Sequence, residues 1–372
     1  MRSTRIILII FLLYCFAIIA HADDTDTSSI MIDYTDGPHI FWKNDSAALV
    51  FYLCENIIDS QTFINPDTIR FDGFCRDTNL EYEIPVGRHH IEPDSFINVS
   101  KIIAVSDIHG EYEYLVDILQ KAGVIDKNQN WIYGDGHLVI DGDIFDRGDM
   151  VTESLWLVYR LEIQAERNGG AVHFILGNHE LMIMQNDNRY INEKYLRGIV
   201  RQSRIDHLDL YGPDMELGRW LKTKPTAVKI NDILFVHGGL APEIIAGDWD
   251  IHKLNNAVRV KLNLRSSQIA FDSTARMLFG SNGPFWYRGY HYEMENRYAQ
   301  ISMAGVDTLL AFYKVNTIVV GHSEVDKISG LYDNKIIAID IPFDELNGLQ
   351  ALLWEKGKYY LINPNGSKEP IK

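Results

Sequence analysis

Short apolar runs separated by polar, turn-forming pieces fill the front of the chain, from about residue 30 to residue 100. Two of these runs, residues 38–42 and 47–53, flank the turn-forming segment Lys43–Ser46. Strands of this length bounded by Asn, Asp, Ser and Pro are typical of small β-sheets. The pattern therefore predicts a β-rich accessory region over residues 23–100.

Strand and helix patterns alternate in the rest of the chain, residues 101–372. Apolar residues at helical spacing predict helices over 111–122 and 151–167. Short apolar runs predict strands at 102–105, 138–140, 172–176, 233–236, 318–320 and 336–339. Such alternation indicates an α/β body whose sheets are buried between helices.

The first residues have the pattern of an export signal. Arg2 and Arg5 precede the apolar run 6–20, which ends at the small-x-small sequence of residues 20–22. The run is shorter than the ~20 apolar residues that span a bilayer. We therefore expect residues 1–22 to be a signal peptide, and the mature protein to be periplasmic or secreted, without a stable membrane anchor.

Composition limits the classes of function. The 372 residues include 35 Lys+Arg and 51 Asp+Glu, for a formal charge of −16, and 46 % are hydrophobic. The apolar content excludes a disordered chain. The negative charge argues against nucleic acid as a partner, because binding it requires neutralising phosphates. Nothing in the sequence indicates an oligomeric state.

Two cysteines, Cys54 and Cys75, remain after removal of the signal peptide. In an oxidising compartment they could close a disulfide loop worth ~3 kcal/mol. They could equally remain two buried thiols.

Polar residues next to glycine follow five of the predicted strands. These segments are residues 106–110 (SDIHG), 141–148 (DGDIFDRG), 177–180 (GNHE), 237–239 (HGG) and 321–322 (GH). Any one of them could be an ordinary turn, but five in order are hard to explain that way. Because ligands bind at the carboxyl ends of strands in α/β sheets, we expect one site built from all five loops. His137 and His173, within or beside apolar strands, we assign to the core or surface.

The residue types in these loops suggest a metal site. Carboxylates, imidazoles and one Asn amide suit Mn, Fe or Zn better than Ca. Two such ions ~3.5–4 Å apart can share a carboxylate and assist in-line attack on phosphorus.

The five segments resemble the motifs GDxHG, GDxVDRG, GNHE, HGG and GH of the calcineurin-like metallophosphoesterases, in the phosphoprotein phosphatase branch. Within that branch, the single His322 and the sequence of residues 283–289 (GPFWYRG) resemble the Shewanella-like phosphatases of bacteria and plants. The resemblance covers residues 101–340. It implies a central β-sandwich flanked by helices, and makes 101–372 the catalytic domain.

The resemblance also implies two divalent ions, Mn, Fe or Zn, and direct attack on the phosphomonoester by a hydroxide that bridges them. The implied metal ligands are Asp107 and His109 for the first ion, Asp143 as the bridge, and Asn178, His237 and His322 for the second.

Further roles follow from the same resemblance. His179 would be the general acid, oriented and kept protonated by Asp146, and a nearby carboxylate does favour imidazolium. Arg147 and Arg288 would bind the phosphate oxygens, as planar bidentate donors do. Arg288 could instead cap an aromatic cluster that includes Trp286.

The sequence departs from the family pattern at two places. Ser106 stands where the family usually has Gly, a small change with little consequence for the metals. Residues 339–342 stand where the eukaryotic serine/threonine enzymes have a Ser-Ala-Pro-Asn-Tyr element, so substrate preference cannot be transferred from those enzymes. We expect a phosphoprotein or phosphopeptide substrate, with phosphotyrosine favoured, in a cleft shaped by the front region and residues 185–224. The alternatives are a small-molecule phosphoesterase, such as a dinucleoside tetraphosphate hydrolase, and a non-catalytic binding module.

Overall fold

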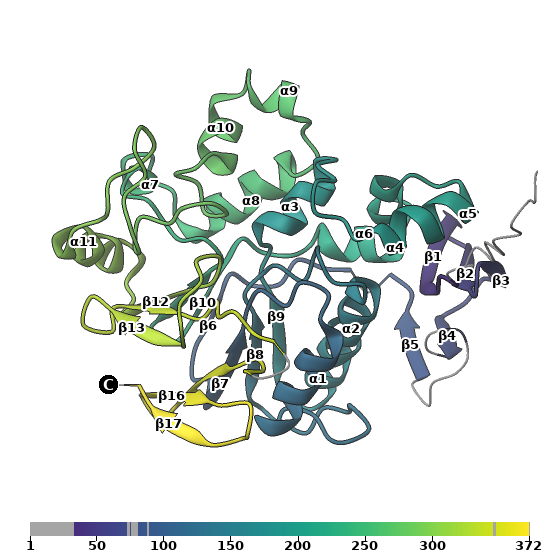
Figure 1. Ribbon diagram of the computed structural model, residues 1–372, viewed down its shortest axis with the longest axis horizontal. Coiled ribbons are helices and arrows are strands. Elements are labelled where there is room, and N and C mark those ends of the chain that lie inside the picture. The colour runs from purple at the N-terminus through teal and green to yellow at the C-terminus, as the bar shows by residue number, and fades with distance from the viewer. Residues whose placement is uncertain (1–32, 73–74, 76–80, 88, 345–346, 372) are drawn as a thin grey trace, which may run out of the picture. The chain divides into compact units, whose positions relative to one another are not determined.

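Two six-stranded sheets form the centre of the structure, a computed structural model (Figure 1). It describes residues 33–72, 75, 81–87, 89–344 and 347–371. The predicted signal peptide lies outside these residues. Within the described part, no helix combines the length and the apolar character needed to cross a membrane.

The first sheet has the strand order β17-β16-β15-β7-β8-β9. Its parallel strands are β7 (Lys101–Val105), β8 (His137–Ile140) and β9 (Ala171–Phe174). Its antiparallel strands are β15 (Ala351–Glu355), β16 (Lys358–Ile362) and β17 (Lys368–Pro370). The parallel strands match the predicted ones, whereas the C-terminal three were not predicted.

The second sheet has the order β13-β14-β12-β11-β10-β6. The parallel strands β11, β12 and β14 lie at its centre: Ile233–Val236, Thr317–Val320 and Ile336–Ala338. The remaining strands are β6 (Ser95–Phe96), β10 (Ala227–Ile230) and β13 (Ser329–Leu331). The five predicted strands that lead into the motif loops are therefore divided between the sheets: three lie in the first sheet and two in the second.

Helices flank the two sheets. The predicted helices are α1 (Tyr112–Lys121) and α2 (Val151–Arg167), which lie side by side, with α2 packed on β9 of the first sheet (Figure 1). On the side of the second sheet, α8 (Ile251–Lys261) packs against β10. The other helices are α3 (Asn178–Met184), α4 (Glu193–Tyr195), the π-helix η2 (Leu196–Val200), α5 (Arg201–Ser203), the 3₁₀-helix η3 (His207–Tyr211), α6 (Glu216–Leu221), α7 (Glu243–Ala246), α9 (Ser266–Ile269), α10 (Ser273–Phe279) and α11 (Met303–Tyr313).

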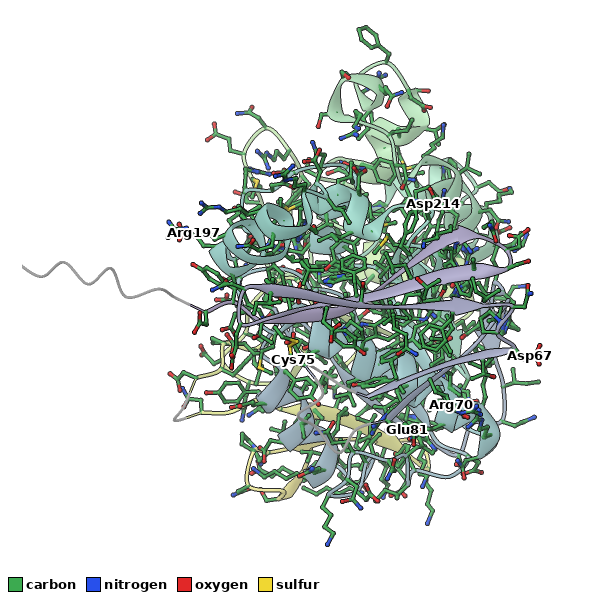
Figure 2. The ribbon with its side chains drawn as sticks, turned by 90° about the vertical axis from the view of Figure 1, so that its right-hand side faces the viewer. Asp67, Arg70, Cys75, Glu81, Arg197 and Asp214 are labelled. Carbon is green, nitrogen blue, oxygen red and sulfur yellow. A yellow bond between two sulfur atoms is a disulfide. The ribbon has the colours of Figure 1, made fainter. Side chains whose placement is uncertain are left out.

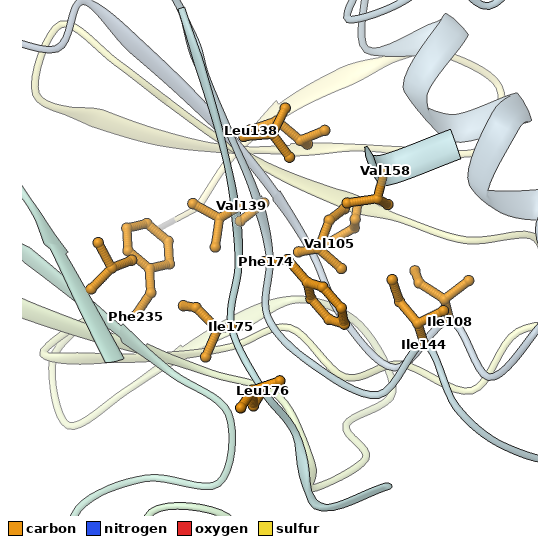
Figure 3. Packing of buried hydrophobic residues seen from close by; sticks show 14 of the residues in the cluster. Val105, Ile108, Leu138, Val139, Ile144, Val158, Phe174, Ile175, Leu176 and Phe235 are labelled. Carbon is orange, nitrogen blue, oxygen red and sulfur yellow. The ribbon is translucent and has the colours of Figure 1, made fainter. Parts of the chain in front are cut away.

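The hydrophobic core has two layers, one on each face of the first sheet. Figure 3 shows Val139 of β8 and Ile175 directed toward Phe235 of β11, between the sheets. On the other face, Phe174 packs toward Val158 of α2. Successive residues of a strand point to opposite faces, so a strand buried on both faces is apolar throughout. The architecture is the predicted β-sandwich between helices.

The front region is rich in β-strands, as predicted. It contains a sheet of β1 (Asp36–Asn44), β2 (Ala47–Cys54) and β3 (Ile57–Ile64), and a pair of β4 (Thr68–Asp72) and β5 (Glu81–Pro85). Cys54, at the end of β2, forms a disulfide with Cys75, with 5.5 Å between the Cα atoms (Figure 2). Of the two alternatives left open by the sequence, the structure therefore has the bridge.

Buried hydrogen bonds attach the front region to the α/β body. The indole of Trp42 donates to Glu216 Oε2 at 2.6 Å, and its backbone N–H donates to the carbonyl of Asp214, which lies beside β1 in Figure 2. From α2, the indole of Trp156 donates to the Pro38 carbonyl at 2.8 Å. These bonds are made across the junction, and residues 33–372 form one compact unit.

Candidate active site

The five motif loops meet at one edge of the two sheets. β7, β8 and β9 supply three of them, and β11 and β12 supply the other two. They enclose a cavity of about 420 Å³. Most of the predicted site residues line this cavity: Asp107, His109, Asp143, Arg147, Asn178, His179, Arg288 and His322. The other two, His237 and Asp146, contact residues of the lining.

The carboxylate of Asp143 lies at the centre of the cluster. Its Oδ2 is 3.3 Å from His237 Nε2, and 3.9 Å from the Nε2 atoms of His109 and His179. Donor atoms of His109, Asp143 and His179 lie close together, and so do those of Asp143, His237 and His322. One carboxylate therefore belongs to two adjacent donor groups, an arrangement consistent with a site for two metal ions.

Backbone carbonyls orient two of the imidazoles. The Nδ1 of His109 is 2.8 Å from the Phe145 carbonyl, and the Nδ1 of His237 is 2.7 Å from that of Asp141. Each contact directs Nε2 toward Asp143. A hydrogen bond of this kind on one ring nitrogen is the usual way in which a metal-binding histidine is held.

His322 and Asp107 complete the cluster. The Nε2 of His322 is buried and has no hydrogen-bond partner among the described residues, although buried polar atoms are normally paired. Its backbone N–H donates to Asp107 Oδ2 at 3.0 Å, and the Ser106 hydroxyl donates to the same oxygen at 2.5 Å. The serine that replaces the family glycine thus supports a predicted ligand.

Backbone conformation is unusual at the site. Asp107, His109, Asp143, Arg147 and His322 have φ angles of 55°, 49°, 56°, 63° and 64°. Non-glycine residues rarely adopt this left-handed region, and clusters of such residues mark functional sites. At Gly177 a Cβ would lie 2.2 Å from Asp143 Oδ1, so only glycine permits the close approach of the two loops.

The electrostatics of the cluster favour a bound cation. Burial raises the pKa of Asp107 to about 6 and lowers that of His109 to about 4. Burial also opposes the charge of His237, but the carboxylates of Asp143 and Asp107 outweigh it and raise the pKa well above the usual value. Buried carboxylates are costly without a compensating charge, which divalent ions would supply. The donors present fit Mn, Fe or Zn.

His179 lies on the rim of the cluster, next to a second carboxylate. Its Nδ1 is 3.0 Å from Asp146 Oδ2. Burial alone would lower the pKa of His179, but Asp143 and Asp146 raise it above the usual value. The ring of Tyr190 packs on the imidazole with 5.3 Å between centroids, and this tyrosine is 47 % exposed.

Two arginines that are far apart in the sequence, Arg147 and Arg288, line the cavity. The backbone of Arg147 is fixed from both ends: its N–H donates to the Tyr190 carbonyl, and its carbonyl accepts from Asn192 Nδ2 at 2.8 Å. The guanidinium of Arg288 lies 3.3 Å from Ser323 Oγ and 3.4 Å from His322 Nδ1. Arg288 therefore reaches the donor cluster, and among the described residues its guanidinium makes no cation–π contact with an aromatic ring.

The sequence analysis did not assign a role to Glu180. This carboxylate is fully buried and accepts backbone N–H groups of Asp143, Ile144, Phe145 and Gly177. It thereby holds the two central motif loops together. In the sequence, the feature that could have pointed to Glu180 is its position as the last residue of the GNHE motif. The side chains of His291 and Tyr292 also line the cavity, and no sequence motif pointed to them.

The expected contribution of the front region is wrong for this cavity. All described residues that line it fall in the span from Asp107 to Asp340. The segment 185–224 does reach the site, because Tyr190 packs on His179 and Asn192 donates to the carbonyl of Arg147. The front region contacts that segment rather than the cavity, at Trp42 and Asp214.

Comparison with known proteins agrees with this geometry. Residues 100–326 match the calcineurin-like phosphoesterase family. The fold matches the crystal structure of a cold-active protein-tyrosine phosphatase of a psychrophile Shewanella species, with a TM-score of 0.84 and 34 % identity over 91 % of this chain and 99 % of that one.

Two curated relatives are Shewanella-like protein phosphatases. One, from Arabidopsis thaliana, is 25 % identical over 71 % of this chain and 79 % of its own length. The other, from Plasmodium berghei, is 29 % identical over 60 % of this chain and 61 % of its own length. The family match, the shared fold and the geometry of the donor cluster lead to one conclusion: the chain belongs to the calcineurin-like phosphoesterases.

Proposed function

We propose that this protein is an exported, metal-dependent phosphatase that hydrolyses phosphotyrosine in proteins or peptides. The main support is its likeness to the Shewanella protein-tyrosine phosphatase, which extends over 91 % of the chain at 34 % identity. The family match over residues 100–326 includes the loops that carry the predicted site residues.

Six residues would hold two divalent ions. Asp107, His109 and Asp143 would bind the first ion, and Asp143, Asn178, His237 and His322 the second. Two observations support this assignment: the buried Nε2 of His322 has no partner in the described part of the chain, and donors converge on Asp143 Oδ2. Bound divalent ions would supply Lewis acidity, which polarises the phosphate and activates water at neutral pH.

His179 would donate the proton that the leaving oxygen requires. The contact of its Nδ1 with Asp146 leaves Nε2 free to face the cavity. The raised pKa favours the protonated ring, which can donate to a departing phenoxide or alkoxide. Asp146 would act as a positioning residue that fixes the ring and its charge.

Arg147 and Arg288 would bind the phosphate oxygens. Both line the cavity, and a guanidinium offers two parallel N–H donors to a phosphate. The fixed backbone of Arg147 reduces the entropy lost when its side chain engages the substrate.

The exposed ring of Tyr190 supports an aromatic leaving group. It packs against His179, where the leaving oxygen would receive its proton. The phenol ring of phosphotyrosine would therefore meet an aromatic face, and such pairs add about 0.5–1.5 kcal/mol beyond the area that they bury. A phosphoserine side chain offers no such contact.

Export is supported by two independent features of the chain. The N-terminal sequence has the charged, apolar and small-residue segments of a signal peptide. The Cys54–Cys75 bridge is of the kind that persists in oxidising compartments.

A substrate panel tests the function. Protein loaded with Mn²⁺ would be given a phosphotyrosine peptide, the same peptide with phosphoserine, and diadenosine tetraphosphate. We expect the highest kcat/KM for phosphotyrosine. Preference for the dinucleotide would assign the small-molecule activity instead, and no turnover of any of the three would reject the phosphatase function.

A further inference from the structure

A second cleft opens from the metal cavity. Its volume is about 460 Å³, and it lies between the start of α1 and the segment that follows β14. The two spaces are continuous, since they share the lining residues Asp107, His109, Arg147, Glu324 and Asp340. Any substrate group next to the phosphorylated side chain could therefore enter it.

One wall of this cleft is apolar. Tyr114 of α1 and Phe343 pack edge to face with 5.2 Å between ring centroids, and Pro342 and Ile341 continue the wall. Ile341 and Pro342 belong to the segment 339–342, which takes the place of the Ser-Ala-Pro-Asn-Tyr element, and Phe343 follows it directly. The departure from that family element thus contributes to the apolar wall.

The rest of the cleft is lined mainly by carboxylates, together with His109 and Arg147 at its junction with the metal cavity. Besides the metal ligand Asp107, four carboxylates are present: Glu111, Glu324, Asp340 and Asp344. Asp340 is only 6 % exposed, and its carboxylate makes no hydrogen bond or ion pair with any described residue. A buried carboxylate without a partner is unfavourable, so a cation that enters the cleft would relieve its cost.

We propose that this cleft binds a lysine or arginine side chain that lies within two residues of the phosphotyrosine. The inference rests on the proposed function and adds a sequence preference to it. The aliphatic stem of such a side chain would pack along Tyr114 and Phe343, and its charge would reach the carboxylates. A hydrated metal ion would match the carboxylates but gain nothing from the aromatic wall. An acidic side chain would be repelled.

Three peptides test the preference on the unaltered protein. They share one phosphotyrosine sequence and carry Lys, Ala or Glu at the two positions on either side. We expect kcat/KM to fall in the order Lys, Ala, Glu, with about a tenfold span at low salt. The span should shrink as salt shortens the Debye length from about 10 Å at 0.1 M to about 3 Å at 1 M.

Two outcomes separate this inference from the function on which it rests. Equal kcat/KM for the three peptides, or preference for Glu, would overturn the cleft proposal and leave the phosphatase function standing. Failure to hydrolyse any phosphotyrosine peptide would overturn the proposed function itself.

A charge reversal locates the preference. Glu111→Lys should reduce the Lys-to-Glu ratio of kcat/KM by about fivefold, while Glu111→Asp should retain it. Asp45→Lys is the matched control, because Asp45 is an exposed carboxylate in the turn between β1 and β2 and lies outside the cleft. An equal change in both Lys variants would indicate a general charge effect and reject the cleft.

Discussion

Two groups of buried histidines lie near the same parallel strands and differ in what their nitrogens face. In the first, His137 of β8 and His173 of β9 contact each other, with 2.8 Å between Nδ1 and Nε2. The other nitrogen of His173 lies 3.4 Å from Glu92, and the ring of Phe96 packs on it. Within this group the two rings pair with each other, and Glu92 is the acid next to the remaining nitrogen of His173.

The second group lies in the loops after the strands. Here the Nε2 atoms of His109, His179 and His237 converge on one oxygen of Asp143 instead of pairing with one another. Backbone carbonyls occupy the opposite nitrogens of His109 and His237. The difference indicates that burial beside an acid does not by itself mark a metal site, whereas convergence of several donors on one carboxylate is consistent with one.

The largest effect is expected at the point of convergence. Asp143→Asn removes the charge of the carboxylate shared by the two donor groups, so we expect turnover to fall by about 10³-fold or more. Metal content per chain should fall with it, as measured by plasma mass spectrometry. Full activity in this variant would contradict the two-metal assignment.

The next effect concerns the role of His179. His179→Asn should lower kcat by about 10²–10⁴-fold, the usual contribution of a general acid. The variant should keep both ions, because the Nε2 of His179 would donate to the substrate and would not bind a metal ion. Loss of an ion would make His179 a ligand, as its distance from Asp143 also permits.

A smaller effect is a shift in pH dependence. Burial lowers the pKa of His179, and the Asp143 and Asp146 carboxylates outweigh burial and raise it. Activity that needs the protonated ring is lost as pH rises through that pKa. Asp146→Asn removes one raising charge, so the alkaline decline of kcat/KM should move to lower pH at unchanged metal content. An unmoved decline would remove Asp146 from the mechanism.

The smallest effect on activity is expected at the paired histidines. His173→Leu should lower the free energy of unfolding by about 1–3 kcal/mol, because it removes the buried hydrogen-bond partner of His137. Urea unfolding would measure the loss. Metal content and kcat should equal those of the unaltered protein, and a loss of metal would show that the two histidine groups are not distinct.

Much of the site was predictable because its residues follow strands directly in the sequence. A strand end fixes where the next residues lie, so Asp107 after β7 and Asn178 after β9 could be placed at one edge. The motif around Glu180 was visible, but its four backbone contacts depend on the distance between two loops. That distance is a tertiary property.

The parts that were missed depend on contacts between distant segments. Tyr190 reaches His179 only because its segment folds back over the loop of Arg147. The cleft beside the metals combines Tyr114 of α1 with Phe343, more than two hundred residues later in the chain. Strands β15 to β17 follow the last motif, and no spacing rule linked them to β7.

The most direct test of the central claim is a metal titration. Protein stripped with a chelator would receive Mn²⁺ in increments while hydrolysis of a phosphotyrosine peptide is followed. The two donor groups that share Asp143 predict no turnover without metal and a plateau at two ions per chain. Full turnover after chelation, or a plateau at a single ion, would contradict a two-metal phosphatase.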